Sequence, residues 1–195
     1  MDGLLAVTPY YNKATQRGLV ESYKAIAKAS NKPIILYNVP SRTGVNIEPE
    51  TYLELSKVDN IVGIKEANGN LAKIMDTFEL VGDKLHIYSG NDDEIVPFLS
   101  LGGMGVISVI SNILPKETVR MCDAFFEGKI EESKALQLKY IPFIRALFSE
   151  VNPIPIKSAM AKIGYCENFL RLPLCTMDKK KEEKMFDIMK ELKII

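Results

Sequence analysis

A lysine inside an apolar run offers the clearest chemistry in this sequence. Lys65 lies within residues 61–67, IVGIKEA, a run that predicts a buried strand. Burial disfavours the charged ammonium form, lowers the pKa of the amine and leaves a nucleophile that can form a Schiff base. The alternative is a lysine at a strand end whose ammonium group simply reaches solvent. The segment by itself favours neither interpretation.

Tyr37 lies at the end of the apolar run that comes before that of Lys65, and Arg42 follows this run. A phenol beside an amine can shuttle protons during imine formation, which makes Tyr37 a candidate catalytic residue. Its alternative is a tyrosine that packs on a sheet with its hydroxyl hydrogen-bonded. The planar guanidinium of Arg42, between a proline and a glycine, suits a substrate carboxylate. The alternative for Arg42 is an ordinary surface arginine.

Other polar or glycine-rich segments carry weaker signals. Tyr10 and Tyr11 suit either a pocket wall or a subunit interface. The glycine-rich residues 101–105 precede a strand, which indicates a tight turn and not a phosphate-binding loop. Asp92 and Asp93 have no evident third ligand for a metal, and we interpret them as the N-terminal cap of a helix.

The elements that must position these residues alternate along the chain. Near-continuous apolar runs predict parallel strands that are buried on both faces. Five such runs occur, at residues 4–8, 34–38, 61–66, 85–89 and 105–109. Helices are expected between them, from Thr15, Pro49, Asn70 and Asp92. Polar residues follow every strand, at the end where parallel α/β folds place their sites. This rhythm predicts a (β/α) barrel or a doubly wound sheet.

The second part of the chain is expected to be helical. Helices are predicted over residues 116–126, 130–150, 156–163 and 179–193, and residues 152–155 read as a turn. We therefore expect a partial (β/α) barrel over residues 1–127 and a C-terminal helical region over residues 128–195. A complete barrel takes roughly 250 residues and eight βα units, so this is either an open sheet or a barrel without its front.

Composition excludes several functional classes. The 195 residues include 25 Lys and Arg against 25 Asp and Glu, so no basic face predicts nucleic-acid binding. No apolar run has the length of a membrane span. One histidine and the wide spacing of Cys122, Cys166 and Cys175 fit no metal site, and we expect neither a metal nor a cofactor. Reduced thiols and a start without signal-peptide character predict a cytoplasmic protein.

Several motifs together resemble the dihydrodipicolinate synthase family, which belongs to the class I Schiff-base aldolases. The resemblance covers essentially the whole chain. It rests on TPYYN (8–12), YNVPSRTG (37–44), GIKEA (63–67), GVISV (105–109), NPIPIK (152–157) and LRLPL (170–174). It implies a (β/α) barrel with a C-terminal helical extension, commonly assembled as a homotetramer built from two dimers.

The resemblance also implies a reaction in lysine and diaminopimelate biosynthesis, and roles for three residues. Pyruvate would form a Schiff base with Lys65, and the derived enamine would attack L-aspartate-4-semialdehyde to give 4-hydroxy-tetrahydrodipicolinate. By matching position, Tyr37 relays protons and Arg42 holds the semialdehyde carboxylate.

Three further residues match positions of the family's site. Tyr11 matches a tyrosine that crosses the dimer interface to join the neighbour's proton relay. Gly90 and Ile107 match backbone positions that line the pyruvate pocket.

One motif of the family does not occur in this sequence. In the family, about three further βα units precede the first strand, as an eight-unit barrel requires, and carry a Gly-Thr-Thr-Gly-Glu loop that binds the pyruvate carboxylate. We therefore expect an N-terminally truncated chain of impaired activity. The alternatives are a non-catalytic fragment that only assembles, or a related pyruvate-dependent aldolase such as N-acetylneuraminate lyase.

Overall fold

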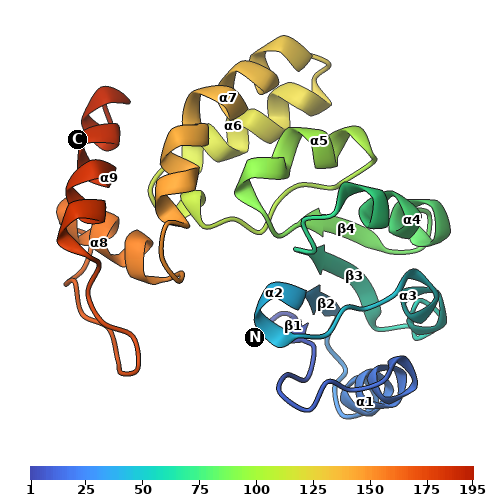
Figure 1. Cartoon of the computed structure of the whole chain (residues 1–195). Helices are drawn as coiled ribbons and strands as arrows, with labels where there is room; N and C mark the ends of the chain where they lie inside the picture. Colours follow the sequence, from blue (N-terminus) through green and yellow to red (C-terminus); the bar gives the residue numbers. More distant parts are fainter. The chain divides into compact units, whose positions relative to one another are not determined.

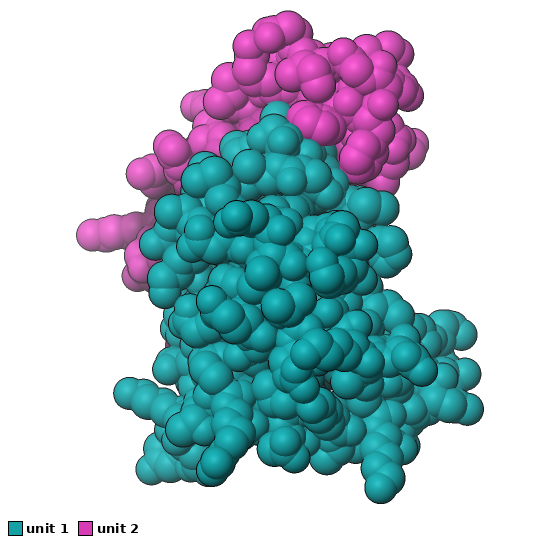
Figure 2. Space-filling view, turned by 90° about the vertical axis from the view of Figure 1, so that its right-hand side faces the viewer, with its two compact units in different colours: residues 1–107 teal, residues 108–195 magenta.

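The computed structural model describes all 195 residues and divides into two compact units, Met1–Ile107 and Ser108–Ile195, which Figure 2 colours separately. The boundary expected at residue 127 concerns where the barrel part of the fold ends, and it stays a prediction. None of the helices is both long and apolar enough to span a bilayer.

The first unit contains a parallel sheet of four strands in sequential order (Figure 1). The strands are β1 (Leu4–Val7), β2 (Ile34–Asn38), β3 (Ile61–Glu66) and β4 (His86–Ser89). Four of the five predicted strands are thus confirmed, since apolar, β-branched runs of this length suit buried parallel strands.

Helices follow the strands in the expected alternation. They are α1 (Gln16–Lys28), α2 (Pro40–Thr43), α3 (Pro49–Leu55), α4 (Leu71–Val81), the 3₁₀ turn η1 (Asp92–Glu94) and α5 (Ile95–Ser100). The predicted caps form: Thr15 Oγ1 accepts from Gly18 N at 3.2 Å, and Asn70 Oδ1 accepts from Ala72 N at 3.1 Å. Arg42 lies on the one-turn helix α2, which begins at Pro40 and is followed by Gly44.

The core of the first unit lies between the sheet and the helices α1, α3 and α4, which cover one face of it (Figure 1). Side chains of a strand point alternately to its two faces. Ile34, Leu36 and Ile64 are fully buried on the helix side. On β1, Leu5 and Val7 are 50% and 41% exposed. The expectation that every strand is buried on both faces is therefore wrong for β1.

The fifth predicted strand is reduced to a single bridge. Met104 N, Ser89 N and Ile107 N form backbone hydrogen bonds of 2.9 Å with Ile87, Gly105 and Ser89, but the only bridge joins Ser89 to Val106. Gly105 has a φ of 143°, and Val109 already has helical dihedrals. The prediction of a strand over residues 105–109 is wrong in extent, because the backbone turns out of the extended conformation at both ends.

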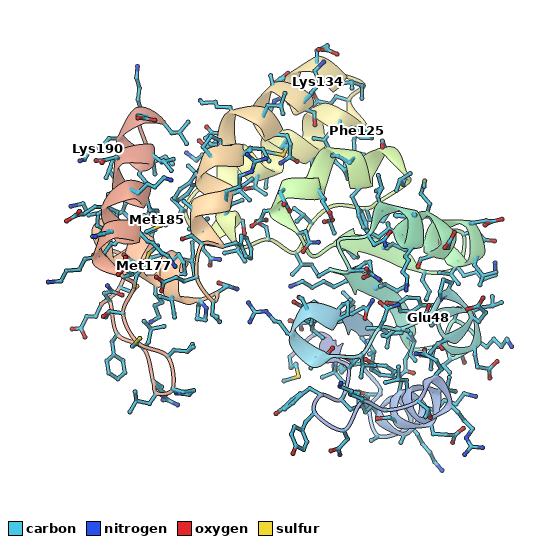
Figure 3. All side chains as sticks on the ribbon, in the orientation of Figure 1. Glu48, Phe125, Lys134, Met177, Met185 and Lys190 are labelled. Atoms are coloured by element: carbon cyan, nitrogen blue, oxygen red, sulfur yellow. The ribbon has the colours of Figure 1, made fainter.

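The second unit is helical. It contains η2 (Ile110–Asn112), α6 (Pro115–Phe126), α7 (Ile130–Leu147), α8 (Ile154–Lys162) and α9 (Lys179–Glu191). Buried Met177, Met185 and Met189 belong to its core, and the first two are labelled in Figure 3. The expected turn over residues 152–155 is partly wrong, because α8 begins at Ile154 and accommodates Pro155 in its first turn, where no amide donor is needed.

Candidate active site

Lys65 and Tyr37 meet at the carboxyl ends of two neighbouring strands. They are partners in the register of β2 and β3, so their side chains leave the same face of the sheet. Lys65 Nζ lies 4.3 Å from the centroid of the Tyr37 ring. An ammonium group at this distance is attracted by the ring face. Lys65 and Tyr37, which the sequence indicated as a possible catalytic pair, are therefore in contact.

Burial changes the proton affinity of both side chains. Lys65 and Tyr37 are half-buried. Burial lowers the pKa of Lys65 below its usual value, and it raises the pKa of Tyr37. Because the neutral amine is the nucleophile, the first shift favours attack on a carbonyl carbon. The second keeps the phenol protonated, so that it can donate a proton.

Arg42 and Asp92 shift the pKa of Lys65 in opposite directions. Arg42, on α2, adds positive charge that lowers the pKa of Lys65 further and limits the rise for Tyr37. Asp92, at the start of η1, is buried and raises the pKa of Lys65. The interpretation of Asp92 and Asp93 as a helix cap is wrong: Asn91 occupies the cap position, both aspartates lie in the first turn, and no side chain caps it.

Gly90 and Ile107 contact the ends of β3 and β4 through their backbone amides. Gly90 N donates to Glu66 O at 2.7 Å, and Ile107 N donates to Ser89 O at 2.9 Å. A Cβ atom at Gly90 would stand 2.7 Å from the Cβ of Ala67, so this position has no room for a side chain. Both residues thus belong to the strand end next to Lys65.

Tyr11 is not brought to this cluster within the chain. Its side chain is 89% exposed, on the loop that follows β1. Its φ of 69° is in the left-handed region, which is uncommon for a bulky residue and often marks functional loops. The position of Tyr11 is compatible with a partner outside this chain.

A family model described as "Dihydrodipicolinate synthetase family" matches residues 1–192. The chain belongs to this family. A 4-hydroxy-tetrahydrodipicolinate synthase from Alkaliphilus oremlandii is 56% identical over 194 residues, which is all of this chain and 67% of that protein. One from Caldicellulosiruptor saccharolyticus is 58% identical over 93% of this chain and 61% of its own length.

Solved structures of the dihydrodipicolinate synthetase family share the fold. The dihydrodipicolinate synthase of Thermotoga maritima superimposes with a TM-score of 0.97 at 44% identity, over the whole of this chain and 67% of that one. The enzyme of Acinetobacter baumannii, solved with pyruvate, gives 0.96 at 40% identity over the same shares. The present chain is thus part of a (β/α) barrel followed by a helical region, and spans 61–67% of these relatives.

Sequence reasoning missed two residues at the strand ends, Tyr88 and Glu66, and gave Asp92 a different role. Tyr88 is the register partner of Lys65 on β4 and shares its face. Glu66 and Asp92 are buried carboxyl groups beside that row. Glu66 had a detectable signal, since a glutamate inside an apolar strand is as unusual as the lysine next to it. Asp92 had none, because only the fold brings η1 toward β3.

Proposed function

We propose that this part of the barrel carries the nucleophile for condensation of pyruvate with L-aspartate-4-semialdehyde. Lys65 Nζ attacks the ketone carbon of pyruvate, and water leaves as the carbon–nitrogen double bond forms. Loss of a methyl proton gives the enamine, whose carbon bonds to the aldehyde carbon of the second substrate. The amino group of that substrate then displaces Lys65 and closes the ring of 4-hydroxy-tetrahydrodipicolinate.

The surrounding residues take the roles that their positions support. Tyr37 transfers protons during imine formation, because its ring lies against Lys65 Nζ. Arg42 binds the semialdehyde carboxylate from α2. The backbone of Gly90 and Ile107 lines the space where pyruvate binds, beside the strand end that they form. Tyr11 serves the site of a second copy in a dimer or tetramer.

The observation that carries the proposal is the half-buried Lys65 amine over the Tyr37 ring, with its pKa lowered by burial. A lysine whose amine only reached solvent would not be desolvated in this way. Two curated relatives that are 56% and 58% identical to this chain are named 4-hydroxy-tetrahydrodipicolinate synthase, which supports the choice of these substrates over those of related aldolases.

Reductive trapping tests the nucleophile. The chain is incubated with pyruvate and borohydride, and its intact mass is measured. We expect one reduced pyruvate adduct, lost in Lys65→Ala and retained in Lys84→Ala, which removes an exposed lysine. The absence of an adduct, or one that survives Lys65→Ala, would overturn the proposal.

We further propose that the 195-residue chain turns over weakly. It contains no Gly-Thr-Thr-Gly-Glu segment, in which the family resemblance places a threonine that links the two tyrosines of the proton relay. One missing proton-transfer element lowers a rate by roughly 10²–10⁴-fold. Steady-state condensation rates test this, and turnover at the level of the full-length relatives would contradict it.

A second candidate is an assembling chain without catalysis. The exposed apolar side chains of Leu5 and Val7, on a strand with a single neighbour, favour association. This candidate predicts oligomers together with no pyruvate adduct. The trapping experiment therefore separates the two.

A further inference from the structure

A row of buried polar residues lies at the strand ends, on the face of the sheet opposite Lys65. Asn38, Glu66 and Ser89 are register partners on β2, β3 and β4, and all three are almost fully buried. Side chains one residue away from Tyr37 and Lys65 must point to the other face. The candidate active site therefore rests on a polar layer that the proposed chemistry does not use.

Glu66 is the ionisable member of this layer and accepts four hydrogen bonds. Its Oε1 accepts from Asn38 Nδ2 at 2.9 Å and from Asn68 N at 2.8 Å. Its Oε2 accepts from Asn38 Nδ2 at 3.1 Å and from the Tyr52 hydroxyl at 3.0 Å. All the partners are donors, so the set fits a carboxylate and would suit an apolar side chain or an amide less well.

These bonds connect Glu66 to the segment that carries Arg42. Asn38 Oδ1 accepts from Ile47 N at 3.1 Å, and Asn38 Nδ2 donates to Asn46 Oδ1 at 2.9 Å. Asn68 Nδ2 donates to the same Asn46 oxygen at 2.7 Å.

Asn46 extends the network to its own segment. Its Nδ2 donates to Glu48 Oε1 at 3.0 Å, and Glu48 is labelled in Figure 3. The segments after β2 and β3 thus converge on one buried carboxyl group.

We propose that Glu66 is a positioning residue for the reaction at Lys65, and that its carboxylate holds the segment 39–48, and with it Arg42, in the arrangement that binds the second substrate. This inference rests on the proposed function, but its structural half does not depend on any reaction. Nothing in the proposal requires Glu66 to touch a substrate, since its side chain lies on the face opposite Lys65.

A purely structural role does not account for a carboxyl group at this position. Burial of an ionisable group opposes folding, and well-packed apolar residues often replace buried charges without loss of stability. Burial raises the pKa of Glu66 to about 7, although its hydrogen bonds to Tyr52, Asn38 and the backbone work in the opposite direction. A residue that lowers stability at neutral pH and fixes two loops is better explained by what the loops carry.

Hydrogen exchange in Glu66→Gln tests the structural half. The amide group places a donor against donors, so we expect residues 39–48 and 67–70 to exchange at least tenfold faster, with α1 unchanged. Tyr52→Phe removes a donor from the same carboxylate on the side of α3 and is expected to leave the two segments protected. Equal loosening in both variants, or no local change in Glu66→Gln, would overturn the proposal.

Asn46→Ala is the second variant, should Glu66→Gln fail to fold. Asn46 is half-exposed, and its Oδ1 accepts hydrogen bonds from both segments. The substitution removes these two bonds and leaves the Glu66 carboxylate in place. We expect the same local increase in exchange. Unchanged exchange of residues 39–48 and 67–70 in Asn46→Ala would count against the proposal.

Single-turnover trapping tests the functional half. The pyruvate imine is formed first, and its loss is followed as L-aspartate-4-semialdehyde is added. We expect Glu66→Gln to trap pyruvate at Lys65 within about threefold of the unaltered rate, but to need at least tenfold more semialdehyde. An equal loss of both steps would indicate a general folding defect and refute positioning.

The two proposals fail in different ways. If the unaltered chain forms no imine, the proposed function fails and the exchange experiment still decides the role of Glu66. If the imine forms and semialdehyde dependence is the same in Glu66→Gln, the positioning role fails and the proposed function stands.

Discussion

At the scale of single residues, the site depends on the balance of charge around one amine. Burial and Arg42 both lower the pKa of Lys65, while Asp92 raises it. Tyr37 covers the amine with its ring face. The reactivity that we propose for Lys65 therefore follows from where the fold places it, and its neighbours shift the pH at which the amine is neutral.

Replacement of Asp92 tests that balance. In Asp92→Asn the charge that favours the ammonium form is lost, so the pH midpoint of pyruvate trapping at Lys65 should move further below 10.5. Asp93→Asn is the matched control, because Asp93 is exposed. A midpoint that stays in place, or moves equally in both variants, would show that Asp92 does not act on the amine.

The buried carboxyl group predicts a pH dependence of stability. The pKa of Glu66 is raised from 4.5 to about 7, so the folded chain retains a proton that the unfolded chain releases. Stability from this group is fully present below pH 4.5 and lost as the pH rises through about 7. The loss is roughly 2–3 kcal/mol.

Denaturant unfolding between pH 4.5 and 8 measures this loss. Glu66→Gln should lack this component, so the two proteins should converge or cross as the pH rises. Tyr52 is the titratable group bonded to Glu66, and Tyr23 and Glu48 act on Tyr52. Parallel pH profiles of the two proteins would contradict the assignment.

At the scale of elements, the close approach of neighbouring strands limits which side chains each position can hold. A Cβ atom at Gly63 would stand 2.6 Å from His86 O, a backbone atom of the neighbouring strand. Glycine therefore permits the register in which Lys65 faces Tyr37 on one side and Tyr88 on the other. The close spacing of β3 and β4 therefore helps to place Lys65 beside Tyr88.

Two Gly→Ala substitutions should have opposite effects. Gly63→Ala must push β3 from β4 and should lower the free energy of unfolding by about 1–3 kcal/mol. Gly18→Ala, in the first turn of α1, makes only ordinary contacts, with Thr15 Oγ1 at 3.5 Å and Ala14 Cβ at 3.8 Å, and should raise the free energy of unfolding by about 0.4–1 kcal/mol. Denaturation midpoints check both, and a stable Gly63→Ala would refute the contact.

At the scale of the whole molecule, the chain contains a sheet with one open edge. β1 pairs only with β2, and its Leu5 and Val7 side chains are substantially exposed. Unpaired backbone groups beside apolar side chains are a template for association. The second unit exposes apolar side chains as well, including Leu172 at 89%.

Charges on β1 should reduce self-association. We expect the double variant Leu5→Lys and Val7→Lys to sediment as a smaller species than the unaltered chain at the same concentration. Leu172→Lys is the control, since it removes exposed apolar surface from the second unit and leaves β1 unchanged. Equal sedimentation of the unaltered and doubly substituted chains would exclude β1 as an association surface.

The sequence by itself determined the local elements and singled out Lys65 as the proposed nucleophile. Strand runs, the caps Thr15 and Asn70, and the unusual Lys65 are visible because propensity, capping and hydrophobic pattern are local. Only the tertiary structure decided the register that sets Lys65 over Tyr37, the approach of Asp92 and the convergence of two loops on Glu66. These depend on pairing between distant segments and on desolvation, which no local pattern encodes. The shortened fifth strand has the same origin, since Gly105 leaves the extended conformation where it pairs with β4.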